Sequence, residues 1–197
     1  SKSVHEPIKI KKNKKINYSM FVINTKFKGL KIIQQKRIGD SRGSLRETFS
    51  KKIIKWDNLI FDYATVSKKN VLRGFHFNSK FPQAKFVTVL KGKILDYVID
   101  LRKKSKTFGK SFSIILSDSN CKSLYIPKGF AHAYYSFSNL NLVYYKLSDY
   151  YAPKYEDGIL WNDKSLKFRW PTKKPIIAKR DTRWKNFEEF KKKYKGL

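Results

Sequence analysis

The sequence predicts an all-β domain, a sandwich or a barrel, that ends in a short C-terminal helix. From Met20 onward, short runs of β-branched and aromatic residues are separated by small turn sequences such as SDSN, PKG and SNLN. Many short strands at regular spacing are typical of sandwiches and barrels. In addition, 41% of the 197 residues are hydrophobic, including 15 Phe, 12 Tyr and 4 Trp. This composition supports a sizeable core and excludes an intrinsically disordered chain.

The first half of the chain contains four interpretable segments. Residues 1–19 are basic and aperiodic, and we interpret them as an N-terminal arm or an expression remnant. The run FKGLKIIQQKRI (27–38) predicts a strand. Segment 44–58 has apolar residues at helix-like spacing and indicates a short helix: Leu45, Phe49, Ile53 and Ile54. In AKFVTVLKGKILDYVIDL (84–101), two β-branched and aromatic runs flank KGK, which predicts a β-hairpin.

The second half continues as strands and ends in a helix. Four short runs predict strands: SFSIILS (111–117), SLYIP (123–127), HAYYSFS (132–138) and NLVYYKLSDYY (141–151). The last segment, 181–197, has aromatic residues three or four positions apart: Trp184, Phe187, Phe190 and Tyr194. This spacing predicts an amphipathic helix, which we expect Asp181 or Thr182 to cap.

The charge of the chain suggests an anionic ligand. There are 45 Lys and Arg against 15 Asp and Glu, a formal net charge of +30. This balance suits a nucleic-acid-binding protein, an enzyme with a phosphorylated substrate, or a lysine-rich solvated surface. Most of the excess is Lys in scattered pairs, whereas surfaces that recognise bases or phosphates favour Arg. Nucleic acid is therefore the least favoured of these partners.

The sequence also predicts a location. It has no run of about 18 apolar residues, so we expect no membrane-spanning helix. Residues 1–19 lack the apolar stretch of a secretory signal. The single cysteine, Cys121, cannot form an internal disulfide and is typical of a reducing compartment. We therefore expect a cytoplasmic protein.

The stretch RGFHFNSKFPQAK (73–85) contains one of only three histidines, His76, between two phenylalanines. This histidine has three possible roles: a core residue, a metal ligand or a general base. A metal site is poorly supported, because Asn78 stands where a second ligand is needed and His132 is the only other plausible ligand. Two histidines without a clustered carboxylate make a weak metal site. We predict no metal.

As a general base, His76 needs partners for carbon-acid chemistry. Lys85 lies nine positions later and could hold an enolate oxygen. Tyr145 could donate a proton to the opposite face of the carbon. Tyr144 and Tyr145 are adjacent, so in a strand one faces inward and the other outward. By the same alternation, Phe75 and Phe77 should face the core on the side away from His76.

Six blocks of the sequence, in collinear order from about residue 25 to about 185, resemble one known family. They are DSRGSLRETF (40–49), NVLRGFHF (70–77), PQAKFVTVLKGKILDYVIDLRKKSKTFGK (82–110), LYIPKGFAHAYY (124–135), YYKLSDYYAPKYEDGILWND (144–163) and FRWPTKKPIIAKRD (168–181). Together they are similar to the dTDP-4-dehydrorhamnose 3,5-epimerase family. The most specific of these motifs are VLRGFHF, IPKGFAH and the pair of sequences DYYAP and WND.

The resemblance implies a fold and an activity. The fold is a double-stranded β-helix (a jelly-roll cupin) with a few short helices, here a single domain over residues 20–197. The activity is epimerisation at C3 and C5 of a dTDP-4-keto-6-deoxyhexose, from dTDP-4-dehydro-6-deoxyglucose to dTDP-4-dehydrorhamnose, in nucleotide-sugar and polysaccharide biosynthesis. The resemblance also implies a homodimer that uses no metal and no cofactor.

The resemblance also assigns roles to residues. His76 matches the base, Asp181 its orienting carboxylate, Lys85 the lysine near the sugar ketone and Tyr145 the acid. Seven further residues match substrate-contact positions: Arg42, Glu47, Arg73, His132, Tyr151, Glu156 and Arg180. Among them, Tyr151 takes the place that stacks on the nucleobase.

The chain departs from the family pattern at two places. Phe61-Asp62-Tyr63 stands where the family usually has Gln-X-Asn, and Ser44-Leu45 replaces a common aromatic pair. Both changes affect substrate contacts and spare the proton-transfer residues. Two alternatives therefore stay open: an epimerase of one centre only (C3 or C5), or an epimerase of another 4-keto nucleotide sugar, such as a GDP-linked one. A basic nucleic-acid-binding β-domain is a remote third, and it predicts steeply salt-dependent binding.

Overall fold

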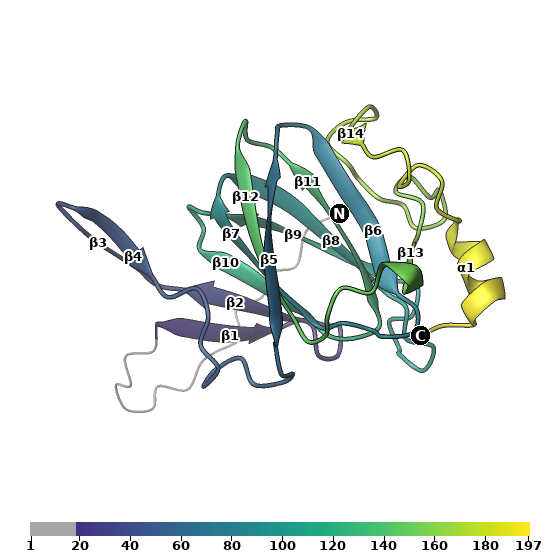
Figure 1. The fold of residues 1–197 in the computed structure, drawn as a ribbon, viewed down its shortest axis with the longest axis horizontal. Helices are drawn as coiled ribbons and strands as arrows, with labels where there is room; N and C mark the ends of the chain where they lie inside the picture. Colours follow the sequence, from purple (N-terminus) through teal and green to yellow (C-terminus); the bar gives the residue numbers. More distant parts are fainter. Residues whose placement is uncertain (1–18) are drawn as a thin grey trace.

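The protein is described by a computed structural model for residues 19–197, and its centre is a pair of β-sheets packed face to face (Figure 1). The first sheet has the strand order β1-β2-β10-β7-β12-β5: Met20–Asn24, Lys31–Gln35, Lys122–Ile126, Lys85–Lys91, Asn141–Leu147 and Phe61–Ser67. The second has the order β13-β6-β11-β8-β9: Glu156–Gly158, Val71–Asn78, Phe130–Ser136, Lys93–Asp100 and Ser111–Ser117.

Smaller elements surround the two sheets. The short strand β14 (Ile176–Ile177) runs parallel to β6, and a 3₁₀ turn, η1 (Pro153–Tyr155), precedes β13. Strands β3 (Arg37–Asp40) and β4 (Gly43–Arg46) form a separate hairpin that projects from the body at the end opposite helix α1 (Phe187–Tyr194) (Figure 1). The predicted all-β class with a C-terminal helix is confirmed, and no helix within residues 19–197 is long and apolar enough to span a membrane.

The predicted hairpin over 84–101 is wrong. β7 pairs with β10 and β12, whereas β8 pairs with β11 and β9, so the two runs belong to different sheets. A single residue, Gly92, separates them, which is shorter than the two-residue loops of tight hairpins. Gly92 has φ +89°, and a Cβ there would lie 2.4 Å from the Leu140 carbonyl oxygen. The chain therefore turns a corner from one sheet into the other.

The helix predicted over 44–58 is also wrong. Its apolar residues do not share one face: Leu45 is 67% exposed in β4, whereas Ile54 is buried. Phe49 packs edge-on against Phe86 of β7, with the ring centroids 5.7 Å apart. The strand predicted over 27–38 is confirmed for β2 and for the start of β3.

The C-terminal helix forms, but its predicted cap is wrong. The N-cap of α1 is Asn186, whose side chain accepts from the backbone N–H of Glu189 while the Glu189 carboxylate accepts from the backbone N–H of Asn186. This capping box satisfies two free N–H groups at the start of the helix. Asp181 is used elsewhere, at His76. The predicted N-terminal arm lies outside the described residues except for Ser19.

Two cores flank the second sheet. One fills the space between the sheets and contains Val87, Val98, Leu124 and Val143. The other lies on the outer face of the second sheet, where Phe75 and Phe77 of β6 pack with Phe187 and Phe190 of α1. The prediction that Phe75 and Phe77 face the core is confirmed. Because side chains alternate along a strand, His76 points into the space between the sheets.

Candidate active site

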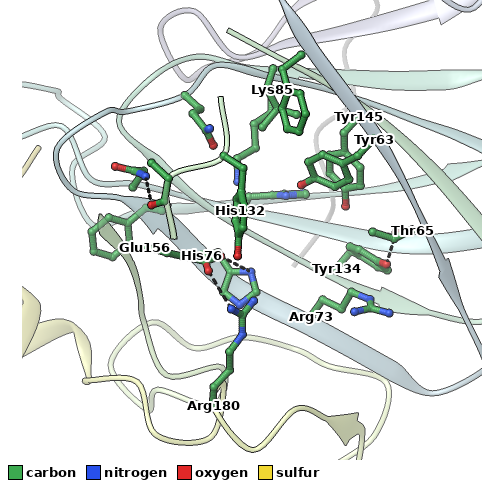
Figure 2. A pocket seen from close by; sticks show the side chains of 17 residues that line it. Tyr63, Thr65, Arg73, His76, Lys85, His132, Tyr134, Tyr145, Glu156 and Arg180 are labelled. Atoms are coloured by element: carbon green, nitrogen blue, oxygen red, sulfur yellow. Dashed lines mark hydrogen bonds and ion pairs between the residues drawn. The ribbon is translucent and has the colours of Figure 1, made fainter. Parts of the chain in front are cut away.

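A cavity of about 370 Å³ opens between the two sheets, and 17 side chains line it (Figure 2). Eight of the eleven residues to which the family resemblance assigns a role are among them: Arg73, His76, Lys85, His132, Tyr145, Tyr151, Glu156 and Arg180. They come from both sheets and from the segments that follow β12 and β14. The fold therefore collects most of the predicted site residues in one place.

His76 and Asp181 form a hydrogen-bonded pair at one wall of this cavity. Asp181 is 105 residues away in sequence, and its Oδ1 accepts from His76 Nε2 at 2.8 Å. The other ring nitrogen, Nδ1, lies 3.8 Å from Glu156 Oε1. The aspartate thus holds a proton on Nε2 and leaves the Nδ1 lone pair free, which is the arrangement of a general base.

The carboxylate of Asp181 is buried and well supplied with donors. Its Oδ2 accepts from the Gly74 backbone N–H at 3.2 Å, and Oδ1 also accepts from Trp184 Nε1 at 3.2 Å. Arg180 Nε is 3.4 Å from Oδ1. Burial alone would raise the pKa of Asp181, but the hydrogen bonds and charge of His76, with Gly74 and Arg180, hold it below its usual value. The pair is therefore set up with the aspartate ionised.

A β-bulge in β6 brings Arg73 to the same cavity as His76. His76 pairs with His132 of β11 and Arg73 pairs with Tyr134, so two residues of β6, Gly74 and Phe75, lie opposite the single residue Ala133 of β11. The extra residue reverses the alternation, which would otherwise place Arg73 on the side of Phe75. Gly74 sits in the bulge with φ +119°, and a Cβ there would lie 2.5 Å from the His132 carbonyl oxygen. Only glycine fits this position.

Lys85, from the first sheet, lines the cavity and extends its side chain into it (Figure 2). Burial lowers its pKa, while the charges of Glu156 and Asp96 oppose that shift. Among residues 19–197, Lys85 makes no side-chain hydrogen bond and no ion pair within 4.0 Å. An ammonium group held in this way is available to a ligand oxygen.

Tyr145 faces His76 across the cavity from the other sheet. It is buried, with 3% of its surface exposed, whereas its neighbour Tyr144 turns outward and donates to Asp62. The predicted alternation of this pair is confirmed. Burial raises the pKa of Tyr145 well above its ordinary value, and the neighbouring Tyr134, Tyr63 and Asp96 add to the shift. The phenol therefore stays protonated and can act as an acid.

A second histidine–aspartate pair lies deeper in the cavity. His132 Nε2 donates to Asp96 Oδ2 at 2.8 Å, and both residues are buried. The other oxygen of Asp96 has no hydrogen-bond partner among residues 19–197. Sequence reasoning missed Asp96, although an acidic residue inside the apolar run ILDYVIDL was a usable signal. Burial raises its pKa, and His132 and Lys85 partly offset this.

Charged and aromatic groups form the mouth of the cavity. Arg180 donates to Glu156 Oε2 at 2.9 Å. Arg73 donates from Nε to Ser67 Oγ at 3.0 Å, and the same hydroxyl bonds to Tyr134 at 2.9 Å, which fixes the guanidinium. Tyr151 lines the mouth and is 59% exposed. Two cations and an exposed aromatic ring in the lining of one cavity suit a phosphorylated ligand with a base.

Comparison with known proteins identifies the family. The profile of the dTDP-4-dehydrorhamnose 3,5-epimerase family matches residues 24–189. The epimerase of Methanothermobacter thermautotrophicus is 37% identical over 174 residues, which cover 85% of this chain and 94% of the relative. The chain belongs to the dTDP-4-dehydrorhamnose 3,5-epimerase family.

Solved structures of this family share the fold. The Bacillus anthracis dTDP-4-dehydrorhamnose 3,5-epimerase, solved with TDP and PPi bound, superimposes with a TM-score of 0.82 at 34% identity, covering 85% of this chain and 99% of that chain. The dTDP-6-deoxy-D-glucose-3,5-epimerase of Legionella pneumophila, in complex with dTDP-4-keto-L-rhamnose, gives 0.81 at 37% identity over 86% and 93%. The cupin-like jelly roll implied by the sequence resemblance is confirmed.

Two expected substrate contacts of the family lie outside the cavity in a single chain. Arg42 is at the tip of the β3–β4 hairpin, where its side chain is 88% exposed and pairs with Asp40 at 2.7 Å. Glu47 follows the hairpin and accepts a hydrogen bond from Ser19.

No three His, Cys, Asp or Glu side chains within the described part of the chain form a group suited to a metal ion.

The departure from the family's Gln-X-Asn sequence places two aromatic rings in the cavity. Phe61 and Tyr63, both on β5, line it. Asp62 between them faces the other way, toward Lys146 and Tyr144. Amide groups that would donate and accept hydrogen bonds are thus replaced by one apolar ring and one phenol.

Proposed function

We propose that this protein is an isomerase that epimerises C3 and C5 of a dTDP-linked 4-keto-6-deoxyhexose. The observation that carries the proposal is the pairing across one cavity of a base and an acid. His76, oriented by Asp181, comes from the second sheet, and Tyr145, a buried protonated phenol, comes from the first. Inverting a carbon centre requires a proton to leave one face and another to arrive on the opposite face.

The first step is removal of a carbon-bound proton. The C4 ketone acidifies the hydrogens on C3 and C5, because the electrons of the broken C–H bond move into an enolate. His76 takes the proton on Nδ1, and the ionised Asp181 on Nε2 stabilises the imidazolium that forms. This is the role that the aspartate has in hydrolytic triads.

The second step is stabilisation of the enolate. Negative charge develops on the oxygen at C4, and Lys85, which lines the cavity and has no ion pair among residues 19–197, can meet it. A donor aimed at a developing oxyanion contributes about 3 kcal/mol. Tyr145 then delivers a proton to the opposite face, which inverts the centre. The Tyr145 phenolate afterwards takes a proton from water, and the His76 imidazolium releases its proton to water.

The dTDP part of the substrate is supported by the mouth of the cavity. Arg73 and Arg180 offer planar guanidinium groups for a diphosphate, and Tyr151 offers a ring for the base. The Bacillus anthracis and Legionella pneumophila relatives were solved with TDP and with a dTDP-sugar. A cytoplasmic location fits an enzyme that uses a nucleotide sugar, and we propose it with the substrate.

We also propose a homodimer in which the β3–β4 hairpin of each chain reaches the cavity of the other. Exposed apolar residues gather on this hairpin and on the edge strand β1: Phe21, Val22, Ile23, Ile38 and Leu45. An exposed apolar edge strand is a ready pairing surface for a second copy. In this arrangement Arg42 and Glu47 of one chain would contact the substrate bound in the cavity of the other chain.

Mixing inactive variants tests the dimer. His76→Ala and Arg42→Ala proteins, mixed and allowed to exchange subunits, should recover activity, because mixed dimers hold one cavity with both residues intact. If light scattering gives a monomer, or if mixing restores nothing, the dimer with a shared site is wrong.

Deuterium exchange tests the reaction itself. The protein is incubated with dTDP-4-keto-6-deoxyglucose in heavy water, and NMR follows the signals of C3–H and C5–H beside a His76→Ala control. Loss of both signals, absent in the control, is the expected result. Loss of one signal favours the single-centre alternative. The observation behind that alternative is the presence of Phe61 and Tyr63 in the lining of the cavity. No loss on this substrate, with exchange on a GDP- or UDP-linked 4-keto sugar, would overturn the dTDP assignment.

A further inference from the structure

A second tyrosine, Tyr63, lies directly against the acid Tyr145. The two residues are register partners on the neighbouring strands β5 and β12, so their side chains leave the first sheet on the same face. Their rings stack with centroids 4.8 Å apart and planes inclined by 20°. Figure 2 shows both phenols projecting side by side into the cavity, on the wall opposite His76.

The hydroxyl groups of these two tyrosines differ from those of their neighbours. The hydroxyl of Tyr134, also in the cavity, is bound to both Thr65 and Ser67. That of Tyr144, on the outer face, is bound to Asp62. Within residues 19–197, neither Tyr63 nor Tyr145 has a hydrogen-bond partner for its hydroxyl, and neither oxygen is sealed from the cavity. Two phenols are therefore free to donate to a ligand.

The two phenols lie at different depths, because 38% of the surface of Tyr63 is exposed whereas only 3% of that of Tyr145 is. Burial and Glu156 raise the pKa of Tyr63 to about 12, so this phenol is protonated at neutral pH and suited to give a proton rather than take one.

We propose that Tyr63 is a second proton donor of the epimerase, so that Tyr63 and Tyr145 each reprotonate one of the two reacting carbons. This inference rests on the proposed function. C3 and C5 lie on either side of the ketone carbon, and two donors at different depths can serve both without a large movement of the ring.

The proposed step is balanced. His76 removes the proton from one carbon, and the C–H electron pair forms the enolate. The Tyr63 O–H bond breaks, its proton forms a new C–H bond on the opposite face, and the ketone returns. The phenolate recovers a proton from water at the mouth, and the His76 imidazolium releases one to water. No oxidant, reductant or cofactor takes part.

The test compares three single variants on dTDP-4-keto-6-deoxyglucose in heavy water. Tyr63→Phe keeps the stacked ring and removes the hydroxyl, and Tyr145→Phe does the same at the acid proposed above. Tyr144→Phe removes a hydroxyl on the outer face and serves as the control. The same reactions are also run in ordinary water, where proton coupling constants in the product report inversion at C3 and C5 separately. Thermal melting confirms that each variant is folded.

We expect Tyr63→Phe to lower the rate of inversion about a hundredfold at one carbon only, as is typical when a general acid is removed. Tyr145→Phe should lower the rate of inversion at the other carbon. Tyr144→Phe should behave as the wild type. The inference is wrong if Tyr63→Phe inverts both carbons at the wild-type rate. It is equally wrong if both carbons slow in proportion, since Tyr63 would then only support Tyr145. If the wild-type protein exchanges neither carbon, the proposed function itself fails.

Discussion

Replacing Asp181 by Asn should lower the exchange rate by about a thousandfold while the fold remains intact. The carboxylate accepts hydrogen bonds on both oxygens, from His76 Nε2 at 2.8 Å on Oδ1 and from the Gly74 N–H at 3.2 Å on Oδ2. An asparagine has one oxygen and one N–H₂ group, so it cannot serve both donors. Each of its two orientations damages a different part of the site.

In the first orientation, the amide oxygen faces His76 and the N–H₂ group faces the buried Gly74 N–H. Two donors then oppose each other, which costs about 1–3 kcal/mol of stability. In the second, the N–H₂ group donates to His76 Nε2, and the ring proton moves to Nδ1, the atom that should act as base. The same change in a hydrolytic triad lowers kcat by about 10⁴. Because both orientations are open here, we expect about 10³, or ~4 kcal/mol in the barrier.

The assay is the initial rate of deuterium incorporation beside a melting curve. A loss of about 2 kcal/mol corresponds to a fall in Tm of about 4–8 °C for a chain of this size. Asp163→Asn is the matched control, because this buried carboxylate accepts from the Phe187 N–H at 2.6 Å and from Ser165, away from the cavity. It should lose stability and keep the rate. An Asp181→Asn protein with more than a tenth of the wild-type rate would refute the reasoning.

Three other changes have defined outcomes. Burial lowers the pKa of Lys85, so activity should begin to fall at an alkaline pH below the usual lysine pKa. Lys85→Arg stays charged and should shift this alkaline fall in activity to higher pH. An unchanged pH profile would contradict the role of Lys85 in stabilising the enolate. Because the pKa of Asp96 is raised in the folded protein, its ionisation costs stability as the pH rises above about 4. The Tm of Asp96→Asn, which keeps a bond to His132, should therefore increase relative to that of the wild type from pH 4 to pH 8. A constant difference in Tm would refute this. Gly92→Ala should unfold at a clearly lower urea concentration than Gly39→Ala. The new Cβ at residue 92 would lie 2.4 Å from a carbonyl oxygen, whereas the nearest atom to a Cβ at residue 39 is 3.5 Å away. Equal urea midpoints would show that the turn at Gly92 relaxes.

Local patterns in the sequence determined where strands lie and which way neighbouring side chains point. The runs that became β9, β10, β11 and β12 could be located because alternation and β-branched content are properties of consecutive residues. The opposite directions of Tyr144 and Tyr145 followed from the same period of two. The family motifs supplied the roles of residues such as Asp181, which no spacing argument connects to His76.

Tertiary structure alone decided which strands pair and which residues meet. β7 and β8 looked like a hairpin, but each found its partners in a different sheet, because pairing depends on the faces that must be buried together rather than on adjacency. Arg73 shares the cavity with His76 only because a bulge at Gly74 reverses the alternation. Contacts across 105 residues and single-residue insertions in a ladder depend on packing between distant segments, which no local period records.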